Sequence, residues 1–294
     1  MTARARKSVD EAVRHFRASP AHAHVVRDSY LDFDVATSAG RFAASAEFAT
    51  VQRLLGDRII GAVVVDLGAG TGIASSAFLH AGATTVYAIE PDSSVEVGQG
   101  AIRRLPQAQR IEVVSAFGEA IPLADQSVDI VYARQVLHHT RNLPEVLREC
   151  RRVLRPGGAF LATREHVVND DRQLARFLKK HPMHQLAGGE NAYRLSEYEH
   201  AIRASGLNLV ASLGPWDSVI NAFPHARSET DLRFLPAKLM RDRFGALGHA
   251  VASLPIVRNL LWSIIRIERP GRMYSFLAVN DDQDSAASAA GSVL

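Results

Sequence analysis

Residues Val63–Gly72, VVVDLGAGTG, decide the fold. The first half of this stretch is a continuous apolar run of strand length, typical of a strand buried on both faces of a parallel sheet. Asp66 is followed by glycines at 68, 70 and 72, and a helical pattern begins at Ile73. Glycines at such a junction allow a tight turn and let a ligand approach the main-chain N–H groups of the helix N-terminus. The stretch therefore predicts a ligand-binding loop at the edge of an α/β sheet.

The spacing of these glycines distinguishes two kinds of binding loop. A nicotinamide-binding loop has the pattern G-x-G-x-x-G, whereas Gly68, Gly70 and Gly72 form G-x-G-x-G and the sixth position is Ile73. Asp66, two positions before the first glycine, also suits a ligand with a positive charge better than a pyrophosphate. The loop argues against a nicotinamide-dependent oxidoreductase.

Short apolar runs alternate with helical patterns after this loop. The predicted strands are Ala62–Leu67, Thr84–Ile89, Ile111–Ser115, Val128–Ala133, Ala159–Thr163, Leu207–Leu213 and Met273–Val279; the predicted helices between the first five are Ile73–Ala81, Asp92–Leu105 and Pro144–Leu154. Strict alternation of strand and helix indicates βαβ units. We therefore expect an α/β fold of the Rossmann-like type, with a doubly wound, mostly parallel, seven-stranded sheet, N-terminal helices, and a helical insert before the last strand.

The chain divides into four predicted parts. They are an N-terminal helical cap (1–56), a core (57–213 with 273–280), a helical insert (214–272) and a disordered tail (281–294). Within them we expect a capping box at Ser8 and Glu11, a helix over Arg41–Leu55 ended by Gly56, a helix over Asp171–Lys180, a loop over His181–Ala192, and a capping box at Ser196 and Glu199. The insert is far longer than a hairpin needs, so it predicts a helical lid over a substrate.

Composition limits the class of protein. The chain has 294 residues, 47% of them hydrophobic and 22% charged, which is ordinary for a globular protein. The 34 Lys and Arg residues less 31 Asp and Glu residues leave a net charge of +3, too small to predict nucleic-acid binding. The single cysteine, Cys150, excludes an internal disulfide and fits a reducing compartment.

No targeting or membrane-spanning segment is expected. The basic start, Met1–Lys7, leads into polar residues rather than an apolar run, and polar residues interrupt the apolar segment Ala246–Ile267. Membrane contact through the basic, apolar segment Ala246–Arg272 is an alternative to its packing as a lid. We therefore predict a soluble, cytoplasmic protein, and the oligomeric state stays open.

Three further motifs follow the glycine loop in order. They are AIEPD at Ala88–Asp92, GEAIPLADQSVDIVYARQVLHHT at Gly118–Thr140, and LRECRRVLRPGGAFLAT at Leu147–Thr163. With the glycine loop, they make the chain resemble the class I S-adenosylmethionine-dependent methyltransferases, particularly the bacterial group with a D-x-G-x-G-x-G loop. The resemblance is strong over residues 59–163 and implies that S-adenosyl-L-methionine is the cofactor.

The resemblance assigns the cofactor-binding residues by position. It implies that Gly68 and Gly70 approach the methionine part, that Asp66 interacts through water with the ammonium, and that Glu90 accepts hydrogen bonds from both ribose hydroxyls. The complete implied set is Asp66, Gly68, Ala69, Gly70, Gly72, Glu90, Pro91, Phe117, Gly118 and Gln135.

One position departs from the family pattern. Many relatives carry an Asp that reaches the adenine amino group where this chain has Phe117. We therefore expect packing and the backbone around Ala116–Gly118 to hold the adenine, while a place for Phe117 in the core remains an alternative.

Candidate catalytic residues follow the fourth and fifth strands. His139, His166 and Glu165 lie at the carboxyl edge, where one of them can act as a base for a hydroxyl acceptor. The alternatives are that His138 and His139 only shape the cofactor pocket and that Arg164–His166 is a structural ion pair. A metal site built from His138, His139, His166, His181 and His184 is a further alternative. No predicted helix carries an i, i+4 His pair with a carboxylate, so we do not expect a metal site.

These residues predict an S-adenosylmethionine-dependent methyltransferase. Polar and aromatic loops at Gly188–Arg194 and Trp216–Pro224 favour a small-molecule or glycan-type acceptor methylated at a hydroxyl oxygen, although simple loop packing explains them too. The alternatives are a C- or N-methyltransferase of a quinone, lipid or natural product, and a cofactor-binding protein without activity.

Overall fold

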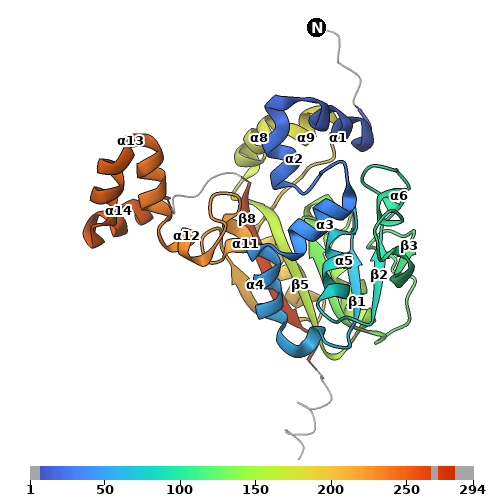
Figure 1. Cartoon of the computed structure of the whole chain (residues 1–294). Coiled ribbons are helices and arrows are strands. Elements are labelled where there is room, and N and C mark those ends of the chain that lie inside the picture. Colours follow the sequence, from blue (N-terminus) through green and yellow to red (C-terminus); the bar gives the residue numbers. More distant parts are fainter. Residues whose placement is uncertain (1–6, 266–270, 282–294) are drawn as a thin grey trace, which may run out of the picture.

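The computed structural model describes residues 7–265 and 271–281. Its centre is a sheet with the strand order β3-β2-β1-β4-β5-β8-β7 (Figure 1). The strands are β1 Val63–Leu67, β2 Thr85–Ile89, β3 Ile111–Val114, β4 Val128–Arg134, β5 Leu154–Val168, β6 Tyr193–Arg194, β7 Asn208–Leu213 and β8 Arg272–Val279. Strands β1–β5 pair in parallel, and β8 runs antiparallel between β5 and β7.

The predicted sheet is confirmed with one correction. The two-residue strand β6 pairs with the end of β5, so the sheet has eight strands rather than seven. The chain leaves β1 towards β2 and β3 on one side and returns to β4 and β5 on the other. Such a reversal opens a crevice at the carboxyl ends of the strands, here beyond β1 and β4.

Helices cover both faces of the sheet and give each face its own core. On one face lie α3 Val35–Ala43, α4 Ala46–Leu55 and α5 Ile73–His80, where Phe42, Phe48, Phe78 and Tyr132 are fully buried. On the other lie α7 Leu143–Val153 and α10 Leu195–Ala204, which pack with the buried Cys150, Phe160, Tyr198 and Phe276. Burial on both sides explains the unbroken apolar runs of the central strands.

The N-terminal helices form as predicted except for one division. The Ser8–Glu11 capping box opens α1 Val9–Ala18, and Gly56 ends α4 with a φ of 58°. The single helix predicted over Arg41–Leu55 is wrong: α3 ends at Ala43, and the Ser45 Oγ accepts a hydrogen bond from the Phe48 N–H at 3.1 Å to begin α4. A serine N-cap inside an apolar pattern thus divided the helix.

The helix predicted over Asp92–Leu105 is also wrong, because only α6 Gln99–Ile102 is helical. The preceding segment is a loop held by tertiary contacts. The Asp10 carboxylate of α1 accepts hydrogen bonds from the Val95 and Glu96 N–H groups, at 3.3 and 3.1 Å. These bonds satisfy backbone groups that the helix would otherwise have paired.

The segment after β5 contains one helix more than predicted. Helix α8 Asp171–Lys180 is confirmed, but the predicted loop His181–Ala192 includes α9 Pro182–Leu186. The Ser196–Glu199 capping box is wrong by two residues: the Arg194 N–H donates to the Glu197 carboxylate at 2.6 Å and begins α10 there.

The segment 214–272 contains helices, as predicted, but its two longest helices do not cover the end of the sheet where β1 and β4 terminate. Its helices are α11 Val219–Ala222, α12 Glu229–Arg233, α13 Leu235–Ser253 and α14 Pro255–Ile265. Helix α11 packs on the core, whereas α13 and α14 project from it as a hairpin (Figure 1). The end of the sheet where β1 and β4 terminate is covered instead by α1, α2 Ala23–Asp28, α8 and α9. The predicted tail lies outside the described residues, except Asp281.

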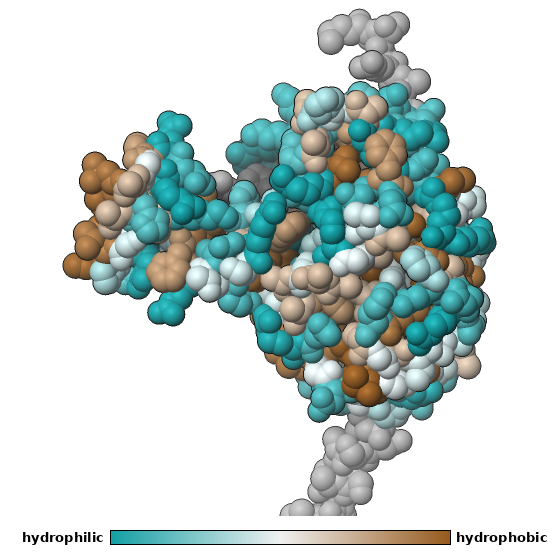
Figure 2. Space-filling view, in the orientation of Figure 1, coloured by the Kyte–Doolittle hydropathy of each residue, from teal (hydrophilic) through white to brown (hydrophobic). Residues whose placement is uncertain are grey.

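The α13–α14 hairpin exposes many apolar side chains. Figure 2 shows hydrophobic surface gathered at its outer end. The exposed apolar side chains of α13 and α14 include Leu247, Ile256 and Leu260, which are 76%, 86% and 63% exposed. No single helix in the described part of the chain has the length and apolar character needed to cross a membrane; α13 and α14 meet those two criteria only together, across a bend of 117°.

Candidate functional site

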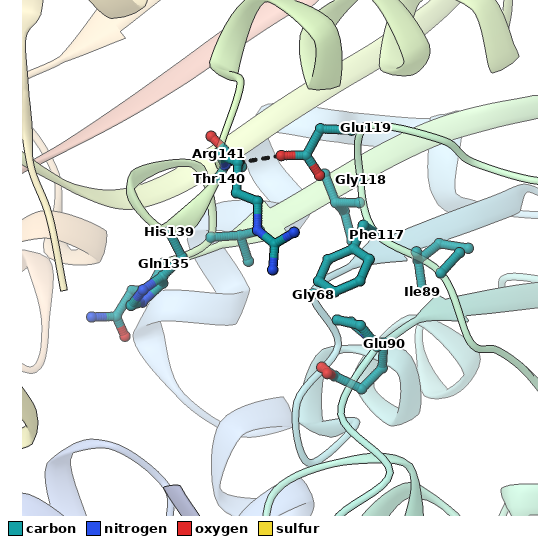
Figure 3. A pocket seen from close by; sticks show the side chains of 14 residues that line it. Gly68, Ile89, Glu90, Phe117, Gly118, Glu119, Gln135, His139, Thr140 and Arg141 are labelled. Carbon is teal, nitrogen blue, oxygen red and sulfur yellow. Dashed lines mark hydrogen bonds between the residues drawn. The ribbon is translucent and has the colours of Figure 1, made fainter. Parts of the chain in front are cut away.

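A cavity of about 300 Å³ lies at the crevice beyond β1, β2 and β4 (Figure 3). Strands β1 and β2 contribute their last residues, and the segments that follow β1, β2, β3 and β4 supply the rest. The lining residues are Leu67 and Gly68, Ile89 to Pro91, Ala116 to Glu119, Gln135 and Val136, and His139 to Arg141. Six of the ten predicted cofactor-binding residues therefore line one cavity: Gly68, Glu90, Pro91, Phe117, Gly118 and Gln135.

Glu90 is a buried carboxylate fixed at this cavity. One of its oxygens accepts a hydrogen bond from the Gly70 N–H at 2.7 Å, and the other from the Asp92 N–H at 2.8 Å. Burial raises the pKa of Glu90, and the two backbone donors oppose that rise. Each oxygen keeps a free acceptor site for a ligand.

The glycine loop brings the backbone close to its neighbours. Gly68 has a φ of 60°, and a Cβ at this position would lie 2.6 Å from the Val136 Cγ2 atom. Only glycine fits both the backbone conformation and this close approach. Ala69, Gly70 and Gly72 continue the turn behind the cavity without lining it.

Asp66 does not line the cavity. Its side chain is buried and accepts a hydrogen bond from the Ser75 Oγ–H of α5 at 2.6 Å. Burial raises the pKa of Asp66 to about 7, the nearby Glu90 adds to the rise, and Ser75 and Arg134 oppose it.

This shift predicts a pH-dependent stability. The folded chain holds the Asp66 proton more tightly than the unfolded chain does. The stability that this proton contributes is therefore complete below pH 4 and is lost as the pH rises through about 7. Urea unfolding without cofactor measures the effect. The free energy of unfolding of the Asp66→Asn variant minus that of the natural chain should increase by up to about 4 kcal/mol between pH 4.5 and 8, because asparagine carries no charge at either pH. Parallel pH profiles for the two proteins would show that Asp66 does not titrate in this range.

Phe117 belongs to the cavity rather than to the core. Its side chain is 53% exposed, and the Arg141 guanidinium lies 5.0 Å from the centre of its ring. The open face of the ring can therefore stack on a flat ligand.

A second cavity of about 400 Å³ adjoins the first and shares Gln135 and His139 with it. Side chains from α1, α2 and the α8–α9 segment close it from above, among them Phe16, Val25 and Met183. Its polar lining is His24, Asp28, Ser29, His138, Arg164, His166, His181 and Glu190. Within the described part of the chain, α12, α13 and α14 line neither cavity.

The predicted catalytic residue Glu165 lines neither cavity in the described structure. It is fully buried, and its carboxylate accepts hydrogen bonds from the Val136 N–H at 3.0 Å and from the His138 N–H at 3.2 Å. It also lies 2.6 Å from the His138 Nδ1 atom. Burial alone would lower the pKa of His138, but Glu165 and Glu190 outweigh burial and raise it to about 9.

The two other predicted catalytic residues lie in the second cavity. The His139 ring is 43% exposed, lies between the two cavities, and has its Nδ1 atom 3.2 Å from the Gly189 carbonyl oxygen. Burial and the charge of His138 lower the pKa of both His139 and His166. Both rings are therefore neutral proton acceptors at neutral pH.

The sequence analysis includes Glu190 in the loop 188–194 but assigns it no role of its own. Its carboxylate lies 3.6 Å from the His138 Nε2 and His181 Nδ1 atoms and 3.8 Å from the His139 Nε2 atom. Burial would raise the pKa of Glu190, but these histidines lower it to about 2. No local sequence pattern identifies this carboxylate as a site residue, because the histidines that it contacts at 138 and 139 lie about 50 residues away in the sequence.

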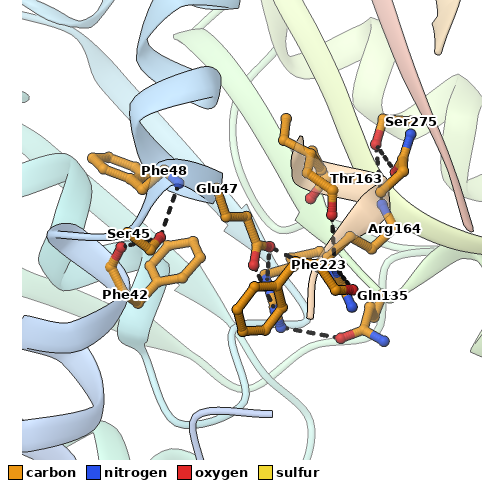
Figure 4. A network of polar contacts seen from close by, with 12 residues as sticks. Phe42, Ser45, Glu47, Phe48, Gln135, Thr163, Arg164, Phe223 and Ser275 are labelled. Carbon is orange, nitrogen blue, oxygen red and sulfur yellow. Dashed lines mark hydrogen bonds and ion pairs between the residues drawn. The ribbon is translucent and has the colours of Figure 1, made fainter. Parts of the chain in front are cut away.

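A buried network joins the N-terminal helices to the site (Figure 4). The Glu47 carboxylate of α4 accepts hydrogen bonds from the Arg134 guanidinium at 2.7 and 3.2 Å, and Arg134 in turn donates to the Gln135 side chain at 3.1 Å. Arg164 donates to the Phe223 carbonyl oxygen at 3.1 Å, next to α11. The network fixes the residues that separate the two cavities.

Comparisons with known proteins agree with this geometry. Residues 65–162 match the family model of a methyltransferase domain. The chain is 30% identical over 223 residues to a dimethylglycine N-methyltransferase of Parasynechococcus marenigrum, covering 72% of this chain and 76% of that protein. It is 27% identical to a ubiquinone biosynthesis O-methyltransferase of Agrobacterium fabrum, covering 54% of this chain and 65% of the relative. It is 32% identical to a malonyl-[acyl-carrier protein] O-methyltransferase of Methylococcus capsulatus, covering 37% and 43%.

Solved structures share the fold. A geranyl diphosphate methyltransferase in complex with SAM has a TM-score of 0.55 and 14% identity, with 94% of this chain and 97% of that chain covered. An S-adenosylmethionine-dependent methyltransferase from Mesorhizobium loti has a TM-score of 0.51 and 17% identity, with 80% and 98% covered. The glycine loop, the carboxylate that follows β2 and these similarities together establish that the chain belongs to the class I S-adenosylmethionine-dependent methyltransferases.

Proposed function

We propose that this protein transfers a methyl group from S-adenosylmethionine to a hydroxyl oxygen of a small-molecule or glycan-type acceptor. The observation that carries the proposal is the pair of adjoining cavities, which share only Gln135 and His139 among their lining residues. In this account the first cavity holds the cofactor and the second holds the acceptor.

The residues of the first cavity fit the cofactor. The Glu90 carboxylate offers two acceptor sites to a ribose diol, and Phe117, Pro91 and Gly118 form a surface for the adenine. Gly68 brings its backbone close to the methionine part, and Ala69, Gly70 and Gly72 complete the turn behind the cavity. Asp66 acts on the ammonium from behind the loop. When bound, the cofactor supplies a methyl group that its sulfonium has already made electrophilic.

The chain mainly has to position the acceptor and manage one proton. Gln135 and His139 lie where the cavities meet, and holding the acceptor there supplies much of the rate enhancement. The neutral His139 Nε2 atom takes the hydroxyl proton, while its Nδ1–H donates to the Gly189 carbonyl oxygen. Glu165 holds the loop that carries both histidines. His166 lies deeper in the second cavity and faces the acceptor rather than the cofactor.

A second candidate is methyl transfer to an amine nitrogen. It is favoured by the match to a dimethylglycine N-methyltransferase over 76% of that protein's length. Arg164, which lines the second cavity, can pair with the carboxylate of such an acceptor. An amine nitrogen attacks without a base if it arrives unprotonated, so this reaction would depend little on His139.

A transfer assay with labelled cofactor tests both candidates. The panel would contain sugars, glycans, phenols and quinones as hydroxyl or ring acceptors, and sarcosine and dimethylglycine as amines. With a hydroxyl acceptor, His139→Ala should reduce turnover by about 10²–10⁴ and leave cofactor affinity unchanged, while the control His184→Ala should match the natural chain. Full turnover of His139→Ala on a hydroxyl acceptor would remove His139 as the base, and exclusive labelling of amines would replace the first candidate by the second.

A further inference from the structure

Glu190 is surrounded by imidazole nitrogens at distances too long for good hydrogen bonds. One oxygen lies 3.6 Å from the His138 Nε2 atom and 3.8 Å from the His139 Nε2 atom, and the other lies 3.6 Å from the His181 Nδ1 atom. Direct hydrogen bonds between such groups are normally about 2.7–3.2 Å long. Glu190 and these three histidines therefore lie close together without forming short direct hydrogen bonds.

These groups form two overlapping sets around the same carboxylate. Glu190 forms one set with His138 and His139 and another with His166 and His181, and the potential ligand atoms of each set lie within 4.8 Å of one another. In the first set, both ring nitrogens of His138 already face a carboxylate, Glu165 at 2.6 Å and Glu190 at 3.6 Å. His138 therefore has no unpartnered nitrogen to offer to an ion.

The second set contains a nitrogen that the protein leaves unsatisfied. The Nδ1 atom of His181 is buried and has no hydrogen-bond partner among the residues that the structure describes. Burying an unpartnered polar atom is costly. The cost is removed if an ion binds between His181 and Glu190.

His166 is oriented as a ligand by its surroundings. Its Nδ1 atom lies 3.1 Å from the Gly271 carbonyl oxygen, so Nδ1 carries the proton and Nε2 keeps its lone pair. The ring packs against Phe177 at 4.5 Å and His181 at 5.5 Å between ring centres. A histidine whose far nitrogen donates to a carbonyl oxygen is the usual arrangement at protein metal sites.

We propose that Glu190, His166 and His181 bind one divalent transition-metal ion, with zinc as the best match, in the wall of the second cavity. Two ligand atoms that are each about 2.0–2.2 Å from a tetrahedral zinc ion lie about 3.3–3.6 Å apart. The Glu190–His181 separation of 3.6 Å matches this value, and the His166 ligand atom lies within 4.8 Å of both, so its ring must approach them to close the site. Imidazole and carboxylate together suit zinc and its neighbours better than magnesium or calcium. Three protein ligands leave one position open towards the cavity.

The open position gives the ion a role at the acceptor. An acceptor oxygen bound there would be held in place and made more acidic, which assists removal of its proton. This role rests on the proposed function, whereas binding of the ion does not. The sequence analysis names His166 and His181 among the histidines of an alternative metal site but not Glu190. The three residues come from β5, from the α8–α9 junction and from the 188–194 loop, so no helix pattern reveals them as one set.

Calorimetric titration of the full chain with zinc chloride, without cofactor or acceptor, tests the proposal. We expect one ion per chain, and Glu190→Gln, His166→Ala and His181→Ala should each weaken binding by at least about 100-fold. His184→Ala, in the neighbouring α9, should bind as the natural chain does. Cobalt(II) absorption should report the same site. Because Glu190 is buried, its replacement risks misfolding, so His181→Ala, with a side chain 23% exposed in the natural protein, provides the independent variant.

Binding of S-adenosylmethionine by each variant serves as the check that it is folded. The proposal is overturned if the natural chain binds no stoichiometric zinc, or if His166→Ala and His181→Ala both keep the natural affinity. Loss of zinc binding in His139→Ala alone would place the ion at the other histidine pair and overturn this ligand set. Since neither cofactor nor acceptor is present in the titration, absence of methyl transfer would not alter its result.

Discussion

Replacing Glu90 by alanine should weaken S-adenosylmethionine binding by about 2–3 kcal/mol, or roughly 30- to 150-fold in Kd. The loss has two sources. The ribose diol loses charge-assisted hydrogen bonds, and the Gly70 and Asp92 N–H groups, now held at 2.7 and 2.8 Å, lose their acceptor. Isothermal titration calorimetry with S-adenosylmethionine and its demethylated product measures the effect.

Two controls make this result specific. Glu90→Gln keeps the shape and one acceptor oxygen, so its loss should be smaller. Glu112→Ala removes an exposed carboxylate from the neighbouring strand β3 and should change nothing. Unchanged affinity in Glu90→Ala, or equally tight binding of NAD by the natural chain, would contradict the assignment of the first cavity.

Replacing Glu47 by alanine should lower the free energy of unfolding by about 3–5 kcal/mol, because it leaves the Arg134 guanidinium buried without its countercharge. The Glu47 side chain is 0% exposed and that of Arg134 is 11% exposed, so water cannot readily replace the lost partner. Urea unfolding monitored by circular dichroism measures the change. Gln135 would also lose its fixed neighbour, so we expect weaker acceptor positioning as well.

An exposed ion pair between the same helix, α4, and α12 provides the comparison. Arg53 and Glu229 lie 2.8 Å apart with side chains 56% and 57% exposed, and Arg53→Ala should cost less than about 1 kcal/mol. The double variant Glu47→Leu with Arg134→Met should recover only part of the stability. It removes the ion pair, but Arg164, 4.0 Å from Glu47, stays buried without that carboxylate. A loss below 1 kcal/mol in Glu47→Ala would show that the pair is not a determinant of stability.

The strands could be predicted from the sequence because burial on both faces leaves them as unbroken apolar runs between glycines. Helix boundaries were less accessible. The Asp92–Gly98 loop is held by the Asp10 carboxylate, more than 80 residues earlier, and no local pattern in the loop reveals such a partner. The segment that forms α13 and α14 was predicted to be helical. How these two helices are oriented relative to the sheet depends on packing contacts that the composition does not specify.

The residues that line the first cavity could likewise be predicted, because they lie at or just after the ends of strands. Glu90 and Gly68 follow directly from the order of the motifs. The second cavity could not be predicted, since Glu190 meets its histidines only after α8 and α9 fold back over β5. Glu165 was placed at the correct edge, but its burial and its three bonds to the 136–138 segment are properties of the packed structure.

A crystal structure of the full chain with S-adenosylhomocysteine tests the central claim most directly. We predict that both ribose hydroxyls lie within hydrogen-bond distance of the Glu90 carboxylate, that the adenine contacts Phe117, and that the sulfur faces the junction of the two cavities at Gln135 and His139. A ligand that lies outside the first cavity, or one whose sulfur points away from that junction, would contradict the account.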